Sequence, residues 1–218
     1  MGKLVVTVCT EDGIFLESEE NGTLNRKYIS SADLPSLFSA TRVTSVGFVP
    51  SMMHYSYKGD VKTIAIATAP EVRQILVRER SERGSPYEKR MVPIPALLWV
   101  FRINKERMSH SFLRAMLKNS DSLYRFPFGN THDNGEICWG NVSLPAITSP
   151  RDASRLPEIF LSSGFNGDLY LSPRNNRNAS LKEFVLSLAT ATVFPEAALN
   201  SSQENVVSYI EAQSADRR

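Results

Sequence analysis

The chain has 218 residues, of which 42% are hydrophobic, and its formal net charge at pH 7 is +2. This length and composition allow one sizeable hydrophobic core, so we expect one α+β domain with extensions. A nearly neutral chain without a long basic run is not expected to bind nucleic acid, and its apolar stretches are too short to span a bilayer. Two cysteines without a signal-like start favour a reducing environment, so we expect a cytoplasmic protein.

The N-terminal part of the sequence is predicted to form β-structure. Residues 4–10 and 13–17 are rich in strand-forming residues and flank Glu11-Asp12-Gly13, a sequence typical of a tight hairpin turn. A short helix is expected at residues 31–38. We therefore predict three regions, which are a β-rich extension packed on the main domain (1–40), the main domain (41–195) and a polar C-terminal tail (196–218).

The central part of the sequence is rich in predicted strands. Their β-branched and aromatic residues place them at 53–58, 63–68, 71–77 and 91–103. Pro93 and Pro95 restrict the last strand to a sheet edge or a bulge, because proline has no N–H to donate. The mixed-charge stretch at residues 78–90 is interpreted as a solvated loop or hairpin tip.

Helices are predicted mainly in the second half of the chain. One is expected at residues 104–117, where Asn104 is a suitable N-cap and apolar residues recur at intervals of four. The later predicted elements are a helix after Pro150 with Pro157 in its first turn, loops at 163–167 and 172–179, a helix at 181–193 and a loosely held helix near 206–210. The element order predicts an α+β domain in which an antiparallel meander sheet packs on helices.

The two cysteines have different surroundings in the sequence. Cys9 lies in an apolar strand-like run, where a cysteine is usually inert packing, whereas Cys138 follows the polar turn Asp133-Asn134-Gly135. A thiol becomes reactive when its thiolate is accessible and stabilised by neighbouring groups. Cys138 is therefore the candidate reactive residue, and we expect Ile137 to abut the main sheet with Cys138 at its accessible rim.

Asn130 precedes Cys138 by eight residues, on the other side of the turn. A chain that folds back at the turn brings the Asn130 amide near the sulfur, where an amide N–H can donate to an oxyanion. The simpler alternative is a turn asparagine whose side chain bonds to the local backbone.

This stretch resembles the active site of ubiquitin-conjugating enzymes, in which a His-Pro-Asn triplet precedes the thioester cysteine by the same interval. Here the triplet reads Phe128-Gly129-Asn130, so the asparagine is kept and its two neighbours are replaced. The chain is more closely similar to the bacterial family D of ubiquitin-conjugating-like proteins, to which protein B of the PRTRC gene cluster belongs. Further matching blocks are Val46-Gly47-Phe48-Val49-Pro50, Val92-Pro93-Ile94-Pro95-Ala96-Leu97-Leu98 and the segment after Pro150.

The resemblance implies a fold, an activity and partners. The fold would be a ubiquitin-conjugating-like α+β domain with an N-terminal strand extension, and the activity would be transfer of a ubiquitin-like modifier through a thioester on Cys138 to an amine. The implied partners are a ThiF-like adenylating enzyme that uses ATP, a ubiquitin-like protein and a JAB-type metallopeptidase. No cofactor or metal is expected in the chain itself, because it has no Gly-rich phosphate loop and its histidines and cysteines lack metal-site spacing.

The resemblance also suggests roles for residues near Cys138. Asn130 would donate to the tetrahedral oxyanion or hold the loop that does so. His132 would favour the Cys138 thiolate or act as a base, and Asp133 would orient His132 or an attacking lysine. His132 and Asp133 rank below Asn130, because residues of a turn can point to solvent.

Three residues are assigned to a channel for the modifier tail: Trp139, Asn134 and Gly135. Trp139 is equally compatible with a core or edge aromatic. Two other functions stay open. The first is a catalytically silent scaffold that binds a ubiquitin-like protein or gene-cluster partners, which the altered triplet suggests. The second is a thiol hydrolase, in which Cys138 and His132 would form the catalytic pair.

Overall fold

The structure is a computed structural model, and it describes residues 3–9, 13–20, 23–29, 52–58, 60–82, 84–118, 120–148, 150–170, 175 and 179–214. The chain divides into two compact units. The first comprises Met1–Val43 with Tyr57–Gly59, and the second comprises Thr44–Ser56 with Asp60–Arg218.

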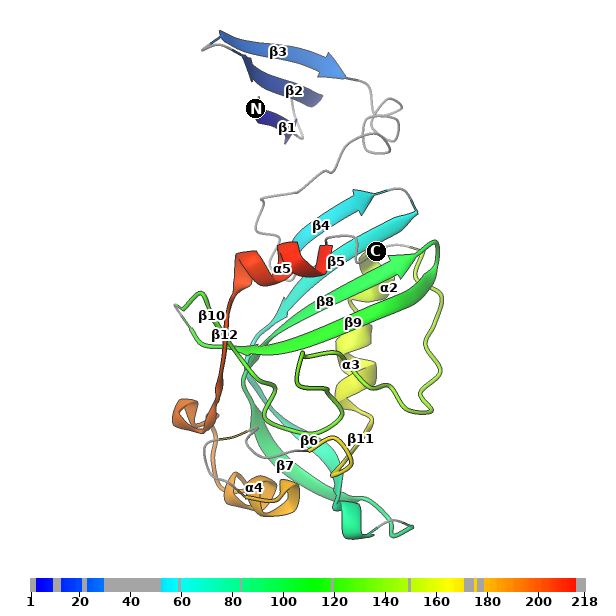
Figure 1. Cartoon of the computed structure of the whole chain (residues 1–218), viewed down its shortest axis with the longest axis vertical. Coiled ribbons are helices and arrows are strands. Elements are labelled where there is room, and N and C mark those ends of the chain that lie inside the picture. The colour runs from blue at the N-terminus through cyan, green and yellow to red at the C-terminus, as the bar shows by residue number, and fades with distance from the viewer. Residues whose placement is uncertain are drawn as a thin grey trace. The chain divides into compact units, whose positions relative to one another are not determined.

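The N-terminal unit contains a three-stranded antiparallel sheet, β1-β2-β3 (Figure 1), formed by β1 (Lys3–Cys9), β2 (Gly13–Glu20) and β3 (Thr23–Ile29). The pairing of Cys9 with Gly13 confirms the predicted first hairpin. Sequence reasoning did not predict β3, although the dipeptide Asn21-Gly22 before it is a strong hairpin signal. The helix expected at 31–38 lies outside the described residues.

The second unit is built on a six-stranded sheet of order β12-β10-β9-β8-β5-β4. Its strands are β4 (Met52–Lys58), β5 (Val61–Thr68), β8 (Ala96–Asn104), β9 (Arg107–Met116), β10 (Ser122–Tyr124) and β12 (Ser201–Asn205). β8 pairs antiparallel with both β5 and β9, so the centre of this sheet is antiparallel, although β5 and β8 are not consecutive strands. The predicted strands at 53–58 and 63–68 are confirmed.

A smaller sheet continues from the same hairpin. It has the order β11-β6-β7, from β6 (Glu71–Arg78), β7 (Glu88–Ile94) and β11 (Gly164–Asn166). β6 follows β5 after Ala69-Pro70, and β7 runs into β8 at Pro95, so β5–β6 and β7–β8 form one long bent hairpin (Figure 1). β7 is an edge strand, which accommodates Pro93 as predicted. The loop expected at 163–167 is wrong, since β11 pairs parallel to β6.

The described helices are short. They are α2 (Pro150–Ala153), α3 (Leu156–Leu161), α4 (Leu181–Ser187) and α5 (Val206–Ser214), with 3₁₀ turns at Arg80–Glu82 and Glu196–Ala198. Pro157 lies in the first turn of α3, as predicted. α4 begins at a capping box formed by Ser180 and Glu183, but it ends well before the predicted residue 193. None of the described helices is long and apolar enough to cross a membrane.

The helix predicted at 104–117 is wrong, because this segment forms strand β9. Asn104 does not cap a helix but opens a tight turn, in which Asn104 pairs with Arg107 and Lys105 has a positive φ of 56°. The apolar spacing of four was ambiguous, since four residues are also two periods of a strand. β9 is buried on both faces between residues 111 and 115, and pairing with β8 satisfies its backbone groups.

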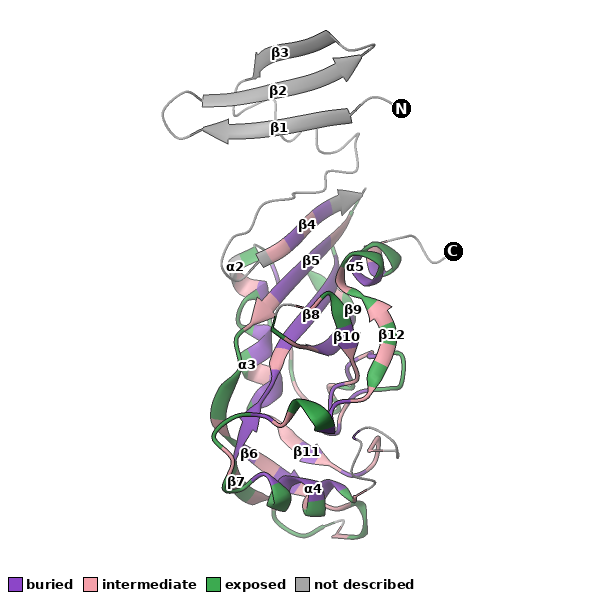
Figure 2. Cartoon of the chain, turned by 90° about the vertical axis from the view of Figure 1, so that its left-hand side faces the viewer, coloured by how far each residue is buried: buried purple, intermediate pink, exposed green. Residues whose placement is uncertain are grey.

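The core lies on both faces of the central sheet, as the purple length of β8 in Figure 2 shows. Along β8, Trp99 and Phe101 face the larger cluster, which includes Phe160 of α3 and Phe184 of α4. Leu98 and Val100, which alternate with them along the strand, face a smaller cluster with Tyr209 and Ile210 of α5. An antiparallel sheet with helices packed on it fits the predicted α+β class.

Candidate functional site

The segment from Asn130 to Cys138 folds back on itself as a small hairpin, hereafter the Cys138 hairpin. The Cys138 N–H donates to the Asn130 carbonyl at 2.9 Å, and the His132 N–H donates to the Glu136 carbonyl at 2.8 Å. The turn is closed by the Gly135 N–H, which donates to the His132 carbonyl. The fold-back expected from the Asp133-Asn134-Gly135 sequence is therefore confirmed.

The second arm of the Cys138 hairpin is docked on β9. The Ile137 N–H donates to Ser111 O, and the Leu113 N–H donates to Gly135 O, both at 2.8 Å. Ile137 is buried, whereas Cys138 is exposed with a free thiol. The prediction that Ile137 abuts the main sheet and leaves Cys138 accessible at its rim is confirmed.

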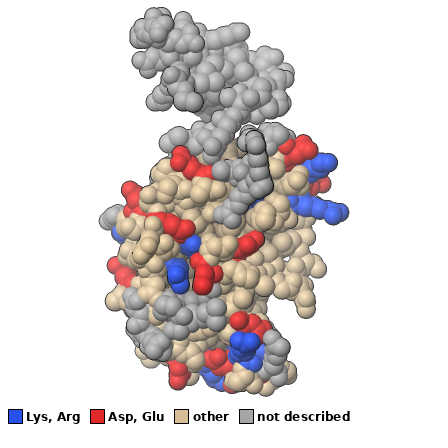
Figure 3. All heavy atoms as spheres, viewed as in Figure 1, with Lys and Arg blue, Asp and Glu red and all other residues tan. Residues whose placement is uncertain are grey.

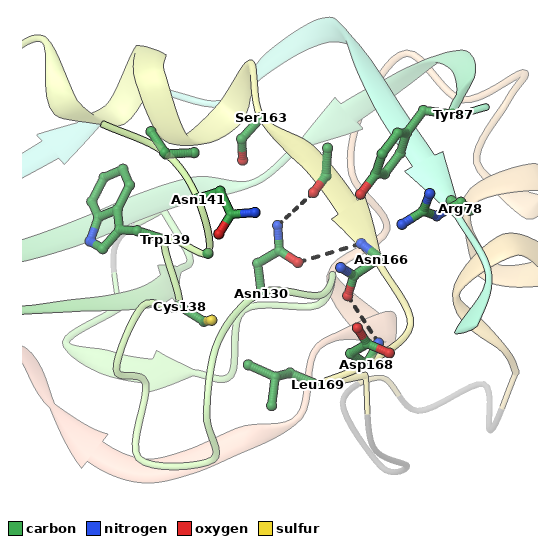
Figure 4. A pocket seen from close by; sticks show the side chains of 13 residues that line it. Arg78, Tyr87, Asn130, Cys138, Trp139, Asn141, Ser163, Asn166, Asp168 and Leu169 are labelled. Carbon is green, nitrogen blue, oxygen red and sulfur yellow. Dashed lines mark hydrogen bonds between the residues drawn. The ribbon is translucent and has the colours of Figure 1, made fainter. Parts of the chain in front are cut away.

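The Asn130 side chain anchors the first arm to β11. Its Nδ2 donates to Gly164 O at 2.8 Å, and its Oδ1 accepts from the Asn166 N–H at 3.4 Å (Figure 4). Asn130 has a positive φ of 64°, a conformation that asparagine tolerates better than most residues. The amide is thus a holder of the loop, and its second N–H has no partner among the described residues.

Cys138 opens onto a pocket of about 540 Å³. Asn130, Cys138 and Trp139 belong to its lining, and Figure 4 shows Cys138 and Trp139 on one side with Tyr87 and Arg78 on the other. The remaining lining residues are Gly140, Asn141, Val142, Ser163, Gly164, Asn166, Asp168 and Leu169. Most of these side chains are polar or small, so the pocket suits an extended peptide or a polar chain rather than a bulky apolar ligand.

A family model described as prokaryotic E2 family D matches residues 34–202, which include the Cys138 hairpin and the pocket. The chain belongs to prokaryotic E2 family D. The resemblance drawn from the sequence is thereby confirmed at the level of the family, which is ubiquitin-conjugating-like. No curated protein and no solved structure matches the chain significantly.

Four other predicted site residues of this family D protein lie on the turn. His132 and Asp133 are exposed, and Asp133 lies 3.8 Å from an Arg125 nitrogen. Asn134 accepts the Glu136 N–H through its side chain, and Gly135 is buried. Among the described residues around the pocket, these four are not part of the lining. The structure therefore gives no support to a channel role for Asn134 and Gly135 or to a Cys138–His132 pair.

Trp139 has a structural contact in addition to its place in the pocket. Its indole N–H donates to Ser111 Oγ at 2.8 Å, and its ring packs edge-on against Phe160 with the ring centroids 5.7 Å apart. Trp139 is therefore an edge aromatic that also lines the pocket, and its role in a channel for the modifier tail stays a prediction. Its ring fixes the chain directly after Cys138 on β9 and α3.

The two replaced positions of the triplet have structural roles in this family D protein. Phe128 is fully buried in an aromatic cluster that includes Phe165 and Phe184. A Cβ at Gly129 would lie 2.5 Å from the carbonyl oxygen of Asn166, so only glycine fits this close approach of the backbone to β11. The first two residues of the triplet therefore pack the hairpin on β11 and leave Asn130 in place.

Sequence reasoning did not find the far wall of the pocket. Arg78 and Tyr87 form a cation–π pair, with the guanidinium carbon 4.4 Å from the ring centroid. The parallel pairing of β11 with β6 sets Asn166 opposite Arg78 and brings this wall to the hairpin. Among the lining residues that sequence reasoning missed, Asn141 could have been suspected, because it lies only three positions after Cys138 in the sequence.

Charges around the site are mixed in sign. Figure 3 shows acidic and basic side chains interspersed over the visible face, without an extended basic surface among the described residues. At the tip of the β6–β7 hairpin, Lys182 of α4 bonds to Glu82 and Glu88, and this pairing raises the pKa of Lys182. The described residues contain no group of His, Cys, Asp or Glu that could hold a metal ion.

Proposed function

We propose that this family D protein accepts a ubiquitin-like modifier as a thioester on Cys138 and passes it to an amine. The observation that carries the proposal is an exposed thiol held opposite Asn130, at the mouth of a polar pocket, in a chain of an E2-like family. A thiol in this position can be reached by a second protein on one side while a peptide tail lies in the pocket.

The first step is the exchange of one thioester for another. The Cys138 thiolate attacks the carbonyl carbon at the C-terminus of the modifier, which arrives as a thioester of its activating enzyme. The new C–S bond forms through a tetrahedral oxyanion, the bond to the donor sulfur breaks, and the donor leaves as a thiolate.

The second step transfers the modifier to nitrogen. An unprotonated amine attacks the same carbonyl carbon, the C–N bond forms, and the amine loses its proton to solvent or to a base on the acceptor. The bond to Cys138 then breaks and regenerates its thiolate. The second N–H of Asn130 is the proposed donor to the oxyanion, a contribution typically worth about 3 kcal/mol.

The proposal requires partners. An activating enzyme of the ThiF-like adenylating type would use ATP to form the first thioester, and a ubiquitin-like protein would be the modifier. A JAB-type metallopeptidase would remove or process the modifier. The reaction is proposed to take place in the cytoplasm, where Cys138 stays reduced.

The experiment is a loading assay with the cognate activating enzyme, ATP and modifier. An adduct that is cleaved by reducing agent is expected for the wild type and for Cys9→Ser. Cys138→Ser should give a more stable oxyester or no adduct, and Cys138→Ala should give none. An adduct that survives Cys138→Ala would exclude this thiol as the acceptor.

A catalytically silent scaffold is the second candidate, and the contacts of Asn130 favour it. One amide N–H and the amide oxygen are already bonded to β11, which is sufficient for a structural role without catalysis. In that case, the modifier binds the folded protein without forming an adduct, even in the presence of the activating enzyme and ATP. Calorimetric titration with the modifier alone, beside the loading assay, separates the two functions.

A further inference from the structure

The C-terminal helix α5 contacts the turn of the Cys138 hairpin. The family match ends at residue 202, so α5 (Val206–Ser214) lies beyond it. The helix packs on β5 and β8, and its Tyr209 and Ile210 are buried at 2% and 6% exposure. The Tyr209 hydroxyl donates to the carbonyl oxygen of Asn134 at 3.3 Å, so the helix reaches the turn directly.

A second contact comes from β9. The Arg114 guanidinium carbon lies 5.0 Å from the centre of the Tyr209 ring, and Arg114 Nε bonds to Glu204 Oε2 of β12 at 2.7 Å. Only 4% of the Arg114 side chain is exposed. A buried guanidinium held by a carboxylate and an aromatic face has little freedom to move, so Arg114 and Tyr209 form a rigid surface beneath the turn.

Gly135 is the point at which the turn meets this surface. Its φ is +86°, and a Cβ added there would overlap the Arg114 guanidinium and lie 2.7 Å from the Tyr209 hydroxyl. The same residue accepts the Leu113 N–H from β9 and donates to His132 within the turn. Gly135 is therefore in contact with β9, α5 and its own hairpin, and the turn cannot move toward β9 or α5 without displacing Arg114 or Tyr209.

We infer that Tyr209, Arg114 and Glu204 are positioning residues that clamp the Cys138 hairpin and so fix the thiol at the mouth of the pocket. Cys138 is the last residue of the hairpin, and its N–H bond to Asn130 is made only while the two arms stay in register. The clamp thus acts on Cys138 through the turn and touches neither the thiol nor the pocket. Its effect on transfer rests on the proposed function, whereas its effect on the hairpin does not.

Hydrogen exchange of the full-length protein tests the clamp without any partner. Tyr209→Phe keeps the ring and removes the hydroxyl, and it should raise the exchange rates of the Gly135, Ile137 and Cys138 amides roughly fivefold, as expected for one lost hydrogen bond. The amides between β5 and β8 should keep their wild-type rates. A purely global loss of stability would raise the exchange of both groups together.

Gly135→Ala is the stronger variant, and Gly84→Ala is its matched control. Gly84 has nearly the same φ, +91°, but no atom lies within 4 Å of a Cβ placed there, so it shares the backbone strain without the contact. Gly135→Ala should accelerate hairpin exchange at least tenfold and change the iodoacetamide alkylation rate of Cys138, whereas Gly84→Ala should change neither. The inference is overturned if Tyr209→Phe leaves hairpin exchange and Cys138 alkylation unchanged. It is also overturned if the two glycine variants give equal exchange and alkylation rates.

Loading kinetics separate this inference from the proposed function. If the wild type loads, Tyr209→Phe should lower the maximal loading rate while the activating-enzyme concentration at half-maximal rate stays the same. That pattern indicates a misplaced thiol rather than a damaged docking surface. If the wild type does not load, the proposed function fails, and the exchange and alkylation results still decide whether the clamp exists.

Discussion

Asn130 holds Cys138 through its main chain and β11 through its side chain. Its carbonyl oxygen accepts the Cys138 N–H at 2.9 Å, while its amide nitrogen donates to Gly164 O at 2.8 Å. The residue thus connects the backbone of Cys138 to β11, which also lines the pocket. A substitution at Asn130 is expected to affect both the stability of the loop and any chemistry at Cys138.

Asn130→Gly isolates the role of the side chain, because glycine adopts the φ of 64° without strain. Loss of the two side-chain hydrogen bonds should lower the free energy of unfolding by about 1–2 kcal/mol, measured by chemical denaturation. Single-turnover discharge to an amine should slow about 10²-fold if the amide stabilises the oxyanion by ~3 kcal/mol. Discharge at the wild-type rate in a less stable protein would reduce Asn130 to a holder of the loop.

His132→Ala is expected to change little at Cys138. The His132 side chain is exposed on the turn and does not belong to the described lining of the pocket. Its backbone bond to Glu136 is kept in the variant. The rate of Cys138 alkylation should therefore follow the same profile as the wild type between about pH 6 and 8, where imidazole titrates. A displaced profile would restore His132 as a residue that tunes the thiolate.

Much of the sheet was predictable, because strand patterns are local. The extended segments at 53–58, 63–68 and 71–77 are confirmed as β4, β5 and β6. The segment at 91–103 is confirmed with a break at Pro95, where the chain passes from one sheet to the other. β9 was mistaken for a helix because its apolar spacing fits both periods, and the choice is made by its pairing with β8 across the tight turn that begins at Asn104.

In the candidate site, too, the features set by local sequence were predictable and those set by tertiary contacts were not. The Cys138 hairpin follows from a local turn sequence, so the pairing of Asn130 with Cys138 was predictable. The wall with Arg78 was not, because it depends on the parallel pairing of a three-residue strand that no periodicity reveals. The clamp was hidden for a similar reason, since only the tertiary fold brings α5 to the turn.

An acid-sensitive contact fastens α3 to β6. Arg73 bonds to both carboxylate oxygens of Glu158, and this bond, with a further one from Ser162, lowers the pKa of Glu158 from its ordinary value of 4.5. A carboxylate with a lowered folded pKa stabilises the protein above its unfolded pKa and loses that contribution as the pH falls through the folded pKa. The stabilisation should thus be full above about pH 5 and decline below it.

In Glu158→Gln, the melting temperature is expected to depend less on pH in the acid range than it does in the wild type. Between about pH 5 and 3, the melting temperature of the wild type should fall more steeply than that of the variant, and the two curves should converge at the lowest pH. Glu106→Gln is the control, because Glu106 is exposed and the described residues show no ion pair for its side chain. Parallel curves for wild type and Glu158→Gln would remove Glu158 as a source of acid sensitivity.

The altered triplet yields the last prediction, in which the His-Pro-Asn sequence of ubiquitin-conjugating enzymes is restored. Gly129→Pro should destabilise the protein, because a Cβ at this position would lie 2.5 Å from the Asn166 carbonyl oxygen, a backbone atom that cannot rotate away. Phe128→His should add to the loss, because it replaces a fully buried ring in an aromatic cluster with a polar one.

Each single variant should lower the free energy of unfolding by more than about 2 kcal/mol, measured by chemical denaturation. Phe128→Leu is the matched control, since it keeps an apolar side chain and should lose less than Phe128→His. In Gly129→Pro, displacement of β11 would break the bond of the Asn130 side chain to Gly164 and loosen the first arm of the hairpin. The Cys138 N–H, which donates to the Asn130 carbonyl, should then exchange faster. If the restored triplet instead leaves stability unchanged and speeds loading, then the replacements at 128 and 129 are not required by packing, and Asn130 is not held by its contact with β11.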